Sequence, residues 1–438
     1  MNTKNNSVNK LVIIGAGSAY TPEIFDEIIK RNNLHISHIS LVDIEEGLER
    51  AQIICDFGKR MFRRAGITCE IDLILNRRAA LKGADFVICQ LRVGGEKARI
   101  QDELIGLQHY IIGQETTGAG GFMNAMRTIP EMLAIAHDME EICPQAWLIN
   151  FTNPSGIVTQ ALSNHTSLNF VGLCNVPVNM HMDIARIMNV TTEDIHCTFI
   201  GLNHLSFVSE ASVRGRDVLL EVLKGIASNE TIMKNIPKIS GVGELTNAID
   251  MVPSPYLQYF YFEEQMLRKQ LDEWKGSGKT RGVITQEINR SLFEQYARFS
   301  LDVKPPELSQ RGGSLYSYSA LNIIEALLSP TPHEIVLNVP ANGAVSDMDK
   351  GDVVEINCMV SRDGVSPIPV GPLPASVSGL IHTVKQYERL TVAAAVQKKR
   401  RLAIQALLNH PLIHGWHNAN SIVHSMEHVF PQFILLQE

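Results

Sequence analysis

The stretch Lys10-Leu-Val-Ile-Ile-Gly-Ala-Gly-Ser-Ala-Tyr-Thr-Pro-Glu23 decides the fold of this chain. Its apolar run ends at Gly15, as the short buried strands of parallel sheets do. Thr21, Pro22 and Glu23 then predict the start of a helix, because Thr is a competent N-cap, Pro suits the first helical position and an acidic residue stabilises the first turn. A buried strand that turns through a Gly-x-Gly loop into a helix is typical of a dinucleotide-binding sheet.

The loop itself predicts an NAD site. Gly15 and Gly17, with Ser18 beside them, allow backbone N–H groups to approach a pyrophosphate, and the helix N-terminus adds positive potential. Asp43 closes the next predicted strand, where a carboxylate can accept hydrogen bonds from an adenosine ribose, which favours NAD over NADP. Tyr20 stands where the third glycine of the usual fingerprint would be, so an ordinary glycine turn is the alternative interpretation.

Outward from this loop, strand and helix patterns alternate as far as residue 175. We predict strands over 38–42, 86–91, 147–151 and 169–173, and helices over 45–64 and 126–143. Such a series indicates a doubly wound parallel sheet. Later segments mix predicted strands, 198–213 and 353–360, with predicted helices, 261–274 and 376–409. The predicted fold is therefore α/β, with a Rossmann-type NAD-binding domain over 1–175 and an α+β lobe over 176–438 for substrate, metal and oligomer contacts.

The composition narrows the functional class. The 438 residues are 45% hydrophobic and 19% charged, which excludes a disordered chain, a collagen-like fibre and a coiled coil. The 46 acidic residues outnumber the 39 basic ones, giving a net charge of −7 that argues against a nucleic-acid partner. No apolar run approaches the ~18–20 residues that span a bilayer. We therefore expect a cytoplasmic protein without a membrane partner.

Polar residues follow several predicted strands at their carboxyl ends, where open α/β sheets bind ligands. Cys174 and His204 each come after an apolar strand, and a thiolate with an imidazole would hold a divalent ion while leaving positions open for substrate oxygens. A buried thiol and an unrelated core histidine are the alternative. The strand-end motifs are Arg92-Val-Gly-Gly95, Thr152-Asn-Pro-Ser-Gly156, Cys174-Asn-Val-Pro177 and Gly201-Leu-Asn-His204.

These motifs occur in an order that resembles the family 4 glycoside hydrolases, most closely their bacterial 6-phospho-β-glucosidases. Further motifs of the resemblance are Ile112-Gly-Gln-Glu-Thr116, Phe151-Thr-Asn-Pro-Ser-Gly156 and Arg311-Gly-Gly313, and it extends from about Lys10 to beyond Val370. The resemblance implies a fold similar to lactate and malate dehydrogenases, NAD and manganese as cofactors, and a homodimer or homotetramer. It also implies a phosphorylated disaccharide or aryl glucoside as substrate.

The resemblance implies an unusual hydrolysis of 6-phospho-β-glucosides, such as cellobiose 6-phosphate. NAD transiently oxidises carbon 3 of the sugar, metal-assisted deprotonation follows at carbon 2, and the aglycone leaves by elimination. Cys174 and His204 match the metal ligands of the family, and Tyr256 best matches the carbon 2 base. Tyr259 and Tyr261 compete with Tyr256 for that alignment.

Four further residues match positions that contact substrate in the family: Arg92, Asn153, Asn175 and Arg281. Arginine suits a phosphate because its guanidinium is planar and remains charged. Arg311 is another candidate, with a purely structural arginine as the alternative. Asn175 stands where α-glycoside relatives commonly carry an acid, and because an amide cannot act as that acid, this residue favours the β-glucoside branch.

Three other functions remain open from the sequence. Another family 4 substrate, such as an α-glucoside 6-phosphate or a galacturonide, would use the same chemistry. A 2-hydroxy-acid dehydrogenase would accumulate NADH, but it leaves Cys174 and His204 unexplained. A non-catalytic NAD-binding sensor would tolerate the loss of Tyr256 and Cys174.

Overall fold

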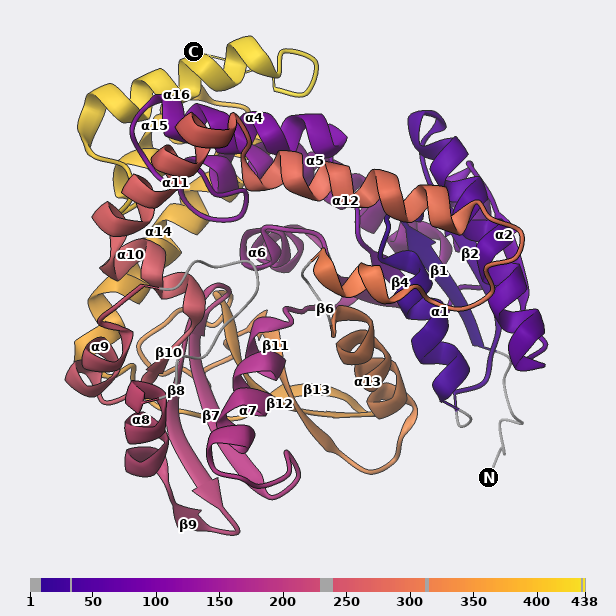
Figure 1. Ribbon diagram of the computed structural model, residues 1–438, viewed down its shortest axis with the longest axis horizontal. Coiled ribbons are helices and arrows are strands. Elements are labelled where there is room, and N and C mark those ends of the chain that lie inside the picture. The colour runs from indigo at the N-terminus through magenta and orange to yellow at the C-terminus, as the bar shows by residue number, and fades with distance from the viewer. Residues whose placement is uncertain (1–8, 32–33, 229–238, 312–314, 435, 438) are drawn as a thin grey trace.

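The computed structural model describes residues 9–31, 34–228, 239–311, 315–434 and 436–437, and most of its helices and strands are labelled in Figure 1. Six parallel strands form the first part of the main sheet: β1 (Asn9–Ile14), β2 (Ile36–Val42), β3 (Glu70–Leu73), β4 (Phe86–Cys89), β5 (Trp147–Asn150) and β6 (Asn169–Gly172). They lie in the order β3-β2-β1-β4-β5-β6. This is the Rossmann order, so the predicted doubly wound sheet is confirmed.

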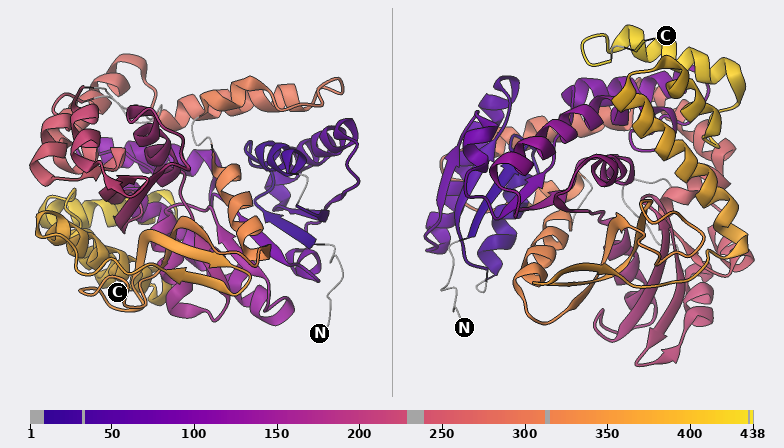
Figure 2. Two further views of the ribbon diagram at one scale, coloured as in Figure 1. Left: turned by 90° about the horizontal axis from the view of Figure 1, so that it is seen from below. Right: turned by 180° about the vertical axis from the view of Figure 1, so that it is seen from behind.

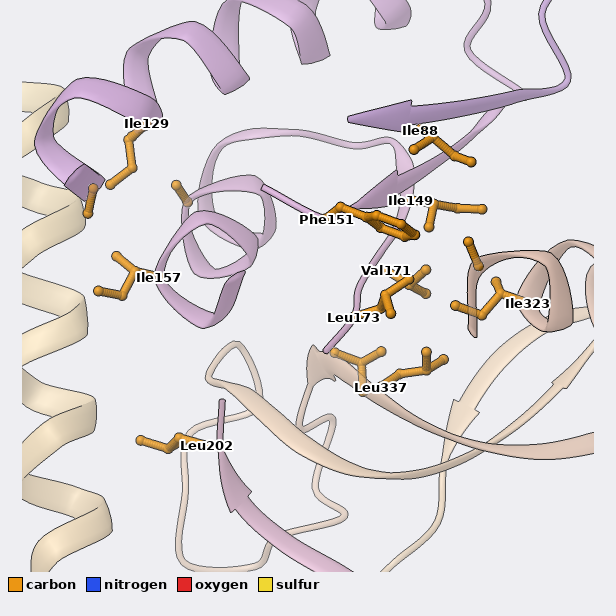
Figure 3. Close-up of a cluster of buried hydrophobic side chains, with 14 of the residues drawn as sticks. Ile88, Ile129, Ile149, Phe151, Ile157, Val171, Leu173, Leu202, Ile323 and Leu337 are labelled. Carbon is orange, nitrogen blue, oxygen red and sulfur yellow. The ribbon is translucent and has the colours of Figure 1, made fainter. Parts of the chain in front are cut away.

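Helices cover both faces of these strands: α1 (Thr21–Lys30), η1 (Glu45–Gly47), α2 (Leu48–Ala65), α3 (Arg77–Leu81), α5 (Gly118–Ile142) and α6 (Ser155–His165). Helix α4 (Gly95–Gln108) packs on α5, farther from the sheet (Figure 1). Ile88 and Ile149 point into one apolar cluster, shown in Figure 3. Val87 and Leu148, their neighbours along the strands, point into another cluster on the opposite face. Burial of both faces explains why these strands read as continuous apolar runs. Helix α5 begins at Gly118, earlier than the predicted residue 126.

The main sheet continues with three antiparallel strands: β11 (His333–Pro340), β12 (Val353–Ser361) and β13 (Gly364–Pro367). Strand β11 joins β6 through Asn338, which pairs with Gly172. The backbone approaches closely there, since a Cβ on Gly172 would lie 2.1 Å from Thr159 Oγ1. One sheet thus extends from the first unit of the chain into its second half. The division of the chain at residue 175 remains a prediction.

A second sheet consists of β7 (Ile195–Leu202), β8 (Leu205–Val213), β9 (Arg216–Asp217) and β10 (Val252–Pro253), with α7 (Val176–Ile187), α8 (Leu219–Ser228) and α9 (Val242–Ile249) nearby (Figure 1). The single strand predicted over 198–213 is wrong. It is a hairpin that reverses at Asn203 and His204, and His204 adopts a positive φ of 61°. The turn matters because it presents His204 at the end of two paired strands.

The remaining helices pack at several places around the two sheets, seen from two further sides in Figure 2. They are η2 (Pro255–Leu257), α10 (Gln258–Tyr261), α11 (Glu263–Ser277), α12 (Arg281–Tyr296), η3 (Pro306–Gln310), α13 (Tyr316–Leu328), α14 (Ala375–Gln397), α15 (Arg400–Asn409) and α16 (Gly415–Val429). The single helix predicted over 376–409 breaks at Lys398, whose φ is 54°. Among the described residues, no helix is long and apolar enough to cross a membrane.

Candidate active site

The glycine loop is held against the ends of β1 and β2. Gly15 has a φ of 84°, and a Cβ there would lie 2.9 Å from the carbonyl oxygen of Gln90. Gly17 N donates a hydrogen bond of 2.6 Å to Asp43 Oδ2, and a Cβ on Gly17 would meet that oxygen at 2.9 Å. Only glycine fits this close approach. The loop and the Asp43 carboxylate therefore form one unit.

This unit fits a dinucleotide. Asp43 Oδ1 accepts a second hydrogen bond, from Ile44 N at 2.9 Å, and a carboxylate still has acceptor sites for ribose hydroxyls. Helix α1 begins at Thr21 behind Ser18, and the Thr21 side chain does not cap it but donates to the Ala16 carbonyl at 2.8 Å. The N-terminus of α1 thus lies beside the loop, where its partial positive charge favours a pyrophosphate.

Cys174 and His204 are the two predicted metal ligands, and the structure buries both, with 3% and 5% of their surfaces exposed. Burial raises the pKa of the Cys174 thiol to about 12. Burial likewise lowers the pKa of His204 to about 3, so its imidazole is neutral and suited to a metal. His204 Nδ1 hydrogen-bonds with Thr116 Oγ1 at 3.0 Å, which leaves Nε2 as the other ring nitrogen.

Hydrogen-bond donors surround the Cys174 sulfur, and they lower the pKa of the thiol that burial raises. Val176 N lies 3.5 Å from it, and the side chains of Asn203 and Tyr316 also hydrogen-bond to it. Asn153, which hydrogen-bonds with Tyr316, has a buried Oδ1 that receives no hydrogen bond from the described residues. A thiol that can give up its proton to a cation and a neutral imidazole form a donor pair that fits a divalent metal.

Tyr256 stacks directly on His204. The ring centroids are 3.7 Å apart and the planes are inclined by 7°. Burial raises the pKa of Tyr256 well above its ordinary value, Tyr259 and Cys174 raise it further, and Arg99 lowers it. The Tyr259 ring centre lies 6.0 Å from that of Tyr256, and Tyr259 packs with Met266 in an apolar cluster that Tyr256 also borders, while Tyr261 is half-buried elsewhere on α10. Of the three tyrosines, Tyr256 is the one that contacts a predicted metal ligand.

We call Cys174, Asn203, His204 and Tyr256 the cysteine–histidine cluster. Its members come from three separate segments of the chain: the end of β6, the β7–β8 turn and η2. Asn175 is adjacent to it, buried at the N-cap position of α7, where its carbonyl accepts a hydrogen bond of 2.6 Å from Asn179 Nδ2. The thiol, amide, imidazole and phenol of this cluster are all uncharged at neutral pH. Each of them is a potential contact for a metal or a substrate.

A second group of residues is strongly charged. Arg92 forms an ion pair with Glu115. Arg99 pairs with the same carboxylate at 3.1 Å and with Glu103 at 3.0 Å. Burial disfavours the charge of Glu115, but Arg92 and Arg99 outweigh it and hold its pKa below the usual range.

Arg281 and Arg311 complete this group. Arg281 Nη2 donates to the Arg311 carbonyl at 2.9 Å, and the Gly282 amide beside it donates to Glu103 Oε2 at 2.7 Å. The Arg311 guanidinium lies 4.1 Å from the centre of the Tyr20 ring, so this group borders the glycine loop. Gly312 and Gly313 of the predicted motif lie outside the described residues. The arginine–glutamate cluster has these members: Arg92, Arg99, Glu103, Glu115, Arg281 and Arg311.

The arginine–glutamate cluster suits a phosphate. Four guanidinium groups face two carboxylates, which leaves an excess of two positive charges, and a sugar phosphate carries nearly two negative ones. Its field reaches the second cluster, because Arg99 lowers and Glu115 raises the pKa of Tyr256. The structure thus gathers the predicted Arg92 and Arg281 with Arg99 and Glu115, for which the sequence suggested no role.

Comparisons with known proteins place these features in a family. The chain matches the model of the family 4 glycosyl hydrolases over residues 10–190 and that of their C-terminal domain over residues 199–413. The chain belongs to glycosyl hydrolase family 4. This family 4 hydrolase is 40% identical to a probable 6-phospho-β-glucosidase of Bacillus subtilis (strain 168), over 92% of both chains. It is 38% identical to the 6-phospho-β-glucosidase of Escherichia coli (strain K12), over 95% of this chain and 94% of that one.

Solved structures agree with this assignment. The 6-phospho-β-glucosidase of Thermotoga maritima, solved with NAD and glucose 6-phosphate, has a TM-score of 0.89 and 31% identity, and the match covers 98% of this chain and 100% of that one. A further structure of that enzyme also contains manganese. A malate dehydrogenase of Cryptosporidium parvum has a TM-score of 0.53 at 14% identity, which shows a common fold alone. The predicted dehydrogenase-like fold is confirmed.

Proposed function

We propose that this family 4 hydrolase cleaves 6-phospho-β-glucosides such as cellobiose 6-phosphate, with NAD and manganese as cofactors. The observation that carries the proposal is the juxtaposition of the two clusters: a surplus of arginine charge for the phosphate lies beside a buried thiol and imidazole for the metal. The relatives at 40% and 38% identity are a probable 6-phospho-β-glucosidase and a 6-phospho-β-glucosidase, which supports the same substrate class.

When bound, NAD and manganese supply hydride acceptance at carbon 3 and Lewis acidity for the enediolate formed by deprotonation at carbon 2. The chain's own residues hold these groups. Gly15, Gly17 and Ser18 present backbone N–H groups to the pyrophosphate, and Asp43 accepts hydrogen bonds from the ribose. Cys174 and His204 hold manganese through sulfur and imidazole nitrogen, and Thr116 orients the His204 ring through its 3.0 Å hydrogen bond.

Tyr256 removes the proton from carbon 2. Its ring lies flat against His204, so a cation held by His204 would lie close to the phenolate and stabilise it. Burial alone opposes this ionisation, which ties the activity of the base to the presence of the metal. Arg99 assists from the other cluster, because its charge also favours the phenolate.

Arg92 and Arg281 bind the phosphorylated sugar, and Asn153 and Asn175 contact its hydroxyl groups. The orphaned Oδ1 of Asn153 is a ready acceptor for one of these hydroxyls. Asn175 cannot protonate a leaving group, which favours β-glucosides over the α-linked substrates of the family. A cytoplasmic location and a homodimer or homotetramer are further parts of this proposal, since a phosphorylating uptake system would deliver the substrate inside the cell.

An assay of p-nitrophenyl-β-glucoside 6-phosphate with NAD and manganese tests the proposal. The expected result is turnover that EDTA abolishes and that accumulates no net NADH. The α-epimer and the non-phosphorylated glucoside are the matched controls. Equal activity on the non-phosphorylated glucoside would refute the phosphate requirement, and net NADH formation from a 2-hydroxy acid would favour a dehydrogenase instead.

A further inference from the structure

The C-terminal tail, which comprises residues 430–434 and 436–437, follows α16 and lies beyond the matched range, which ends at residue 413. Helix α16 lies beside α4, as Figure 1 shows, and Ser425 of α16 hydrogen-bonds with His109 at the end of α4 at 3.1 Å. Helix α4 begins at Gly95, immediately after the Arg92 loop, residues 92–94. Helix α4 thus connects the end that contacts α16 to a loop that the proposed function assigns to substrate.

Phe430 covers a buried ion pair behind this loop. The Arg127 guanidinium lies 4.1 Å from the centre of the Phe430 ring, which is near enough for a cation–π interaction. Arg127 binds both oxygens of Asp102, at 2.9 and 2.6 Å, and both side chains are completely buried. Without the ring, water would reach this pair and compete for its hydrogen bonds.

Arg127 connects the ion pair to the loop. Its Nε donates to the Val93 carbonyl at 3.4 Å, and Val93 is the neighbour of Arg92. Phe433 reaches the loop directly, since a Cβ on Gly94 would lie 3.3 Å from the edge of its ring. Gly94 has a φ of 82°, a conformation that side chains other than glycine disfavour. Phe433, which is 39% exposed, thus lies against Gly94, and Phe430 reaches the neighbouring Val93 through Arg127.

The tail has its own anchor at the other end. Gln437 N donates to the Lys398 carbonyl at 2.7 Å, and Arg400 N donates to the Gln437 carbonyl at 2.8 Å. These bonds lie at the break between α14 and α15. The break that interrupts the predicted long helix therefore serves as the attachment point for the tail.

We propose that Phe430 and Phe433 of the C-terminal tail are positioning residues that hold the Arg92 loop in its substrate-binding conformation. The inference rests on the proposed role of Arg92 in binding the phosphorylated sugar. Neither ring touches substrate. They act through Arg127 and the backbone of Val93 and Gly94, so their loss should weaken binding of the phosphate more than it slows the chemical step.

Phe433→Ala and Phe430→Ala test the proposal in the full-length holoenzyme. The expected result is a rise of about tenfold in KM for the phosphorylated glucoside and in Kd for glucose 6-phosphate, with little change in kcat. The Kd values for NAD and manganese should remain those of the wild type. Phe430→Tyr, which keeps the aromatic face, should restore binding, whereas Phe430→Leu should not. Trp416→Ala is the control, since this aromatic side chain of α16 is exposed.

Hydrogen exchange without ligand reports on the loop itself. The Gly95 amide bonds to the Arg92 carbonyl at 2.9 Å and the Ala98 amide to the Gly94 carbonyl at 3.2 Å, and both should exchange faster in Phe433→Ala. Unchanged exchange and unchanged Kd for glucose 6-phosphate in a folded Phe433→Ala protein would overturn the proposal. Failure of the proposed function shows itself differently, as a wild-type enzyme that does not cleave the phosphorylated glucoside.

Discussion

Each of the two clusters of the candidate active site has a buried glutamate in or beside it, and the pKa values of these two glutamates are shifted in opposite directions. Glu115 lies among arginines, and Arg92 and Arg99 keep its pKa below the usual range although burial opposes this. Glu355 of β12 lies behind the cysteine–histidine cluster, and burial raises its pKa to about 7. Its partners are neutral: Asn203 at 3.0 Å, Ser206 at 2.8 Å and Asn338 at 3.2 Å.

This difference shows that the two clusters differ in the charge they carry before a ligand binds. The arginine–glutamate cluster carries its own charges, so its surplus of two positive charges would already be in place for an arriving phosphate. The cysteine–histidine cluster is uncharged by itself, because its thiol, imidazole and phenol all remain neutral when buried. A cation changes that balance, since it stabilises the thiolate and the phenolate together. One cluster therefore has its charges in place without a ligand, whereas the other would acquire them only with the proposed metal.

Cys174→Ser should cause the largest effect, because it removes the one ligand of the neutral cluster that can become an anion. We expect manganese-dependent turnover to fall by on the order of 10⁴-fold, the effect of losing a Lewis acid worth several kcal/mol. NAD binding and the melting temperature of the metal-free protein should change little. Unchanged activity at limiting manganese would remove Cys174 from the site and with it the contrast between the clusters.

Tyr256→Phe should come next. Loss of a general base typically costs 10²–10⁴-fold, so we expect a fall of about 10³-fold in kcat together with loss of solvent deuterium incorporation at carbon 2. Tyr259→Phe is the matched control, since Tyr259 lies one turn away and Tyr256 is the tyrosine that stacks on His204. A larger loss in the control than in Tyr256→Phe would assign the base to Tyr259.

Arg92→Lys tests the charged cluster at constant charge. A lysine ammonium cannot reproduce the planar pairing of a guanidinium, so KM for the phosphorylated substrate should rise by roughly 30-fold while kcat falls much less. The non-phosphorylated glucoside provides the comparison, because its binding should barely change. A fall in kcat with an unchanged KM would place Arg92 in the chemistry and not in phosphate binding.

The smallest expected effect concerns Glu355 and pH. A carboxyl group with a pKa of about 7 in the folded protein and ~4.3 in the unfolded chain stabilises the fold fully below pH ~4.3. That contribution is lost as the pH rises through 7, and it amounts to on the order of 3 kcal/mol. In Glu355→Gln the melting temperature of the metal-free protein should therefore fall less between about pH 5 and pH 8, by roughly 2–5 °C. Parallel pH profiles for the two proteins would show that burial does not raise the pKa of Glu355.

Much of the candidate site was predictable from strand ends. Cys174 and Arg92 follow apolar runs that pair in a parallel sheet, and the carboxyl ends of parallel strands meet at one edge. Arg99 was not predictable in this way. It lies on α4 within a charged run that resembles an ordinary solvated helix face. It is enclosed only because α12 packs on α4, where the Gly282 amide donates a hydrogen bond to Glu103. The hairpin that presents His204 was also missed, because its turn interrupts an apolar run without a Gly or Pro between Leu202 and Leu205.

The sequence by itself determined the Rossmann sheet, its glycine loop and the identity of the residues at its strand ends. These properties depend on local periodicity and on the conformations that glycine alone adopts, so they can be read from neighbouring residues. Tertiary structure alone decided which tyrosine lies on His204, which arginines share Glu115 and where the C-terminal tail rests. Those contacts join segments far apart along the chain, and their charges shift one another's pKa only once burial has removed the water that would screen them.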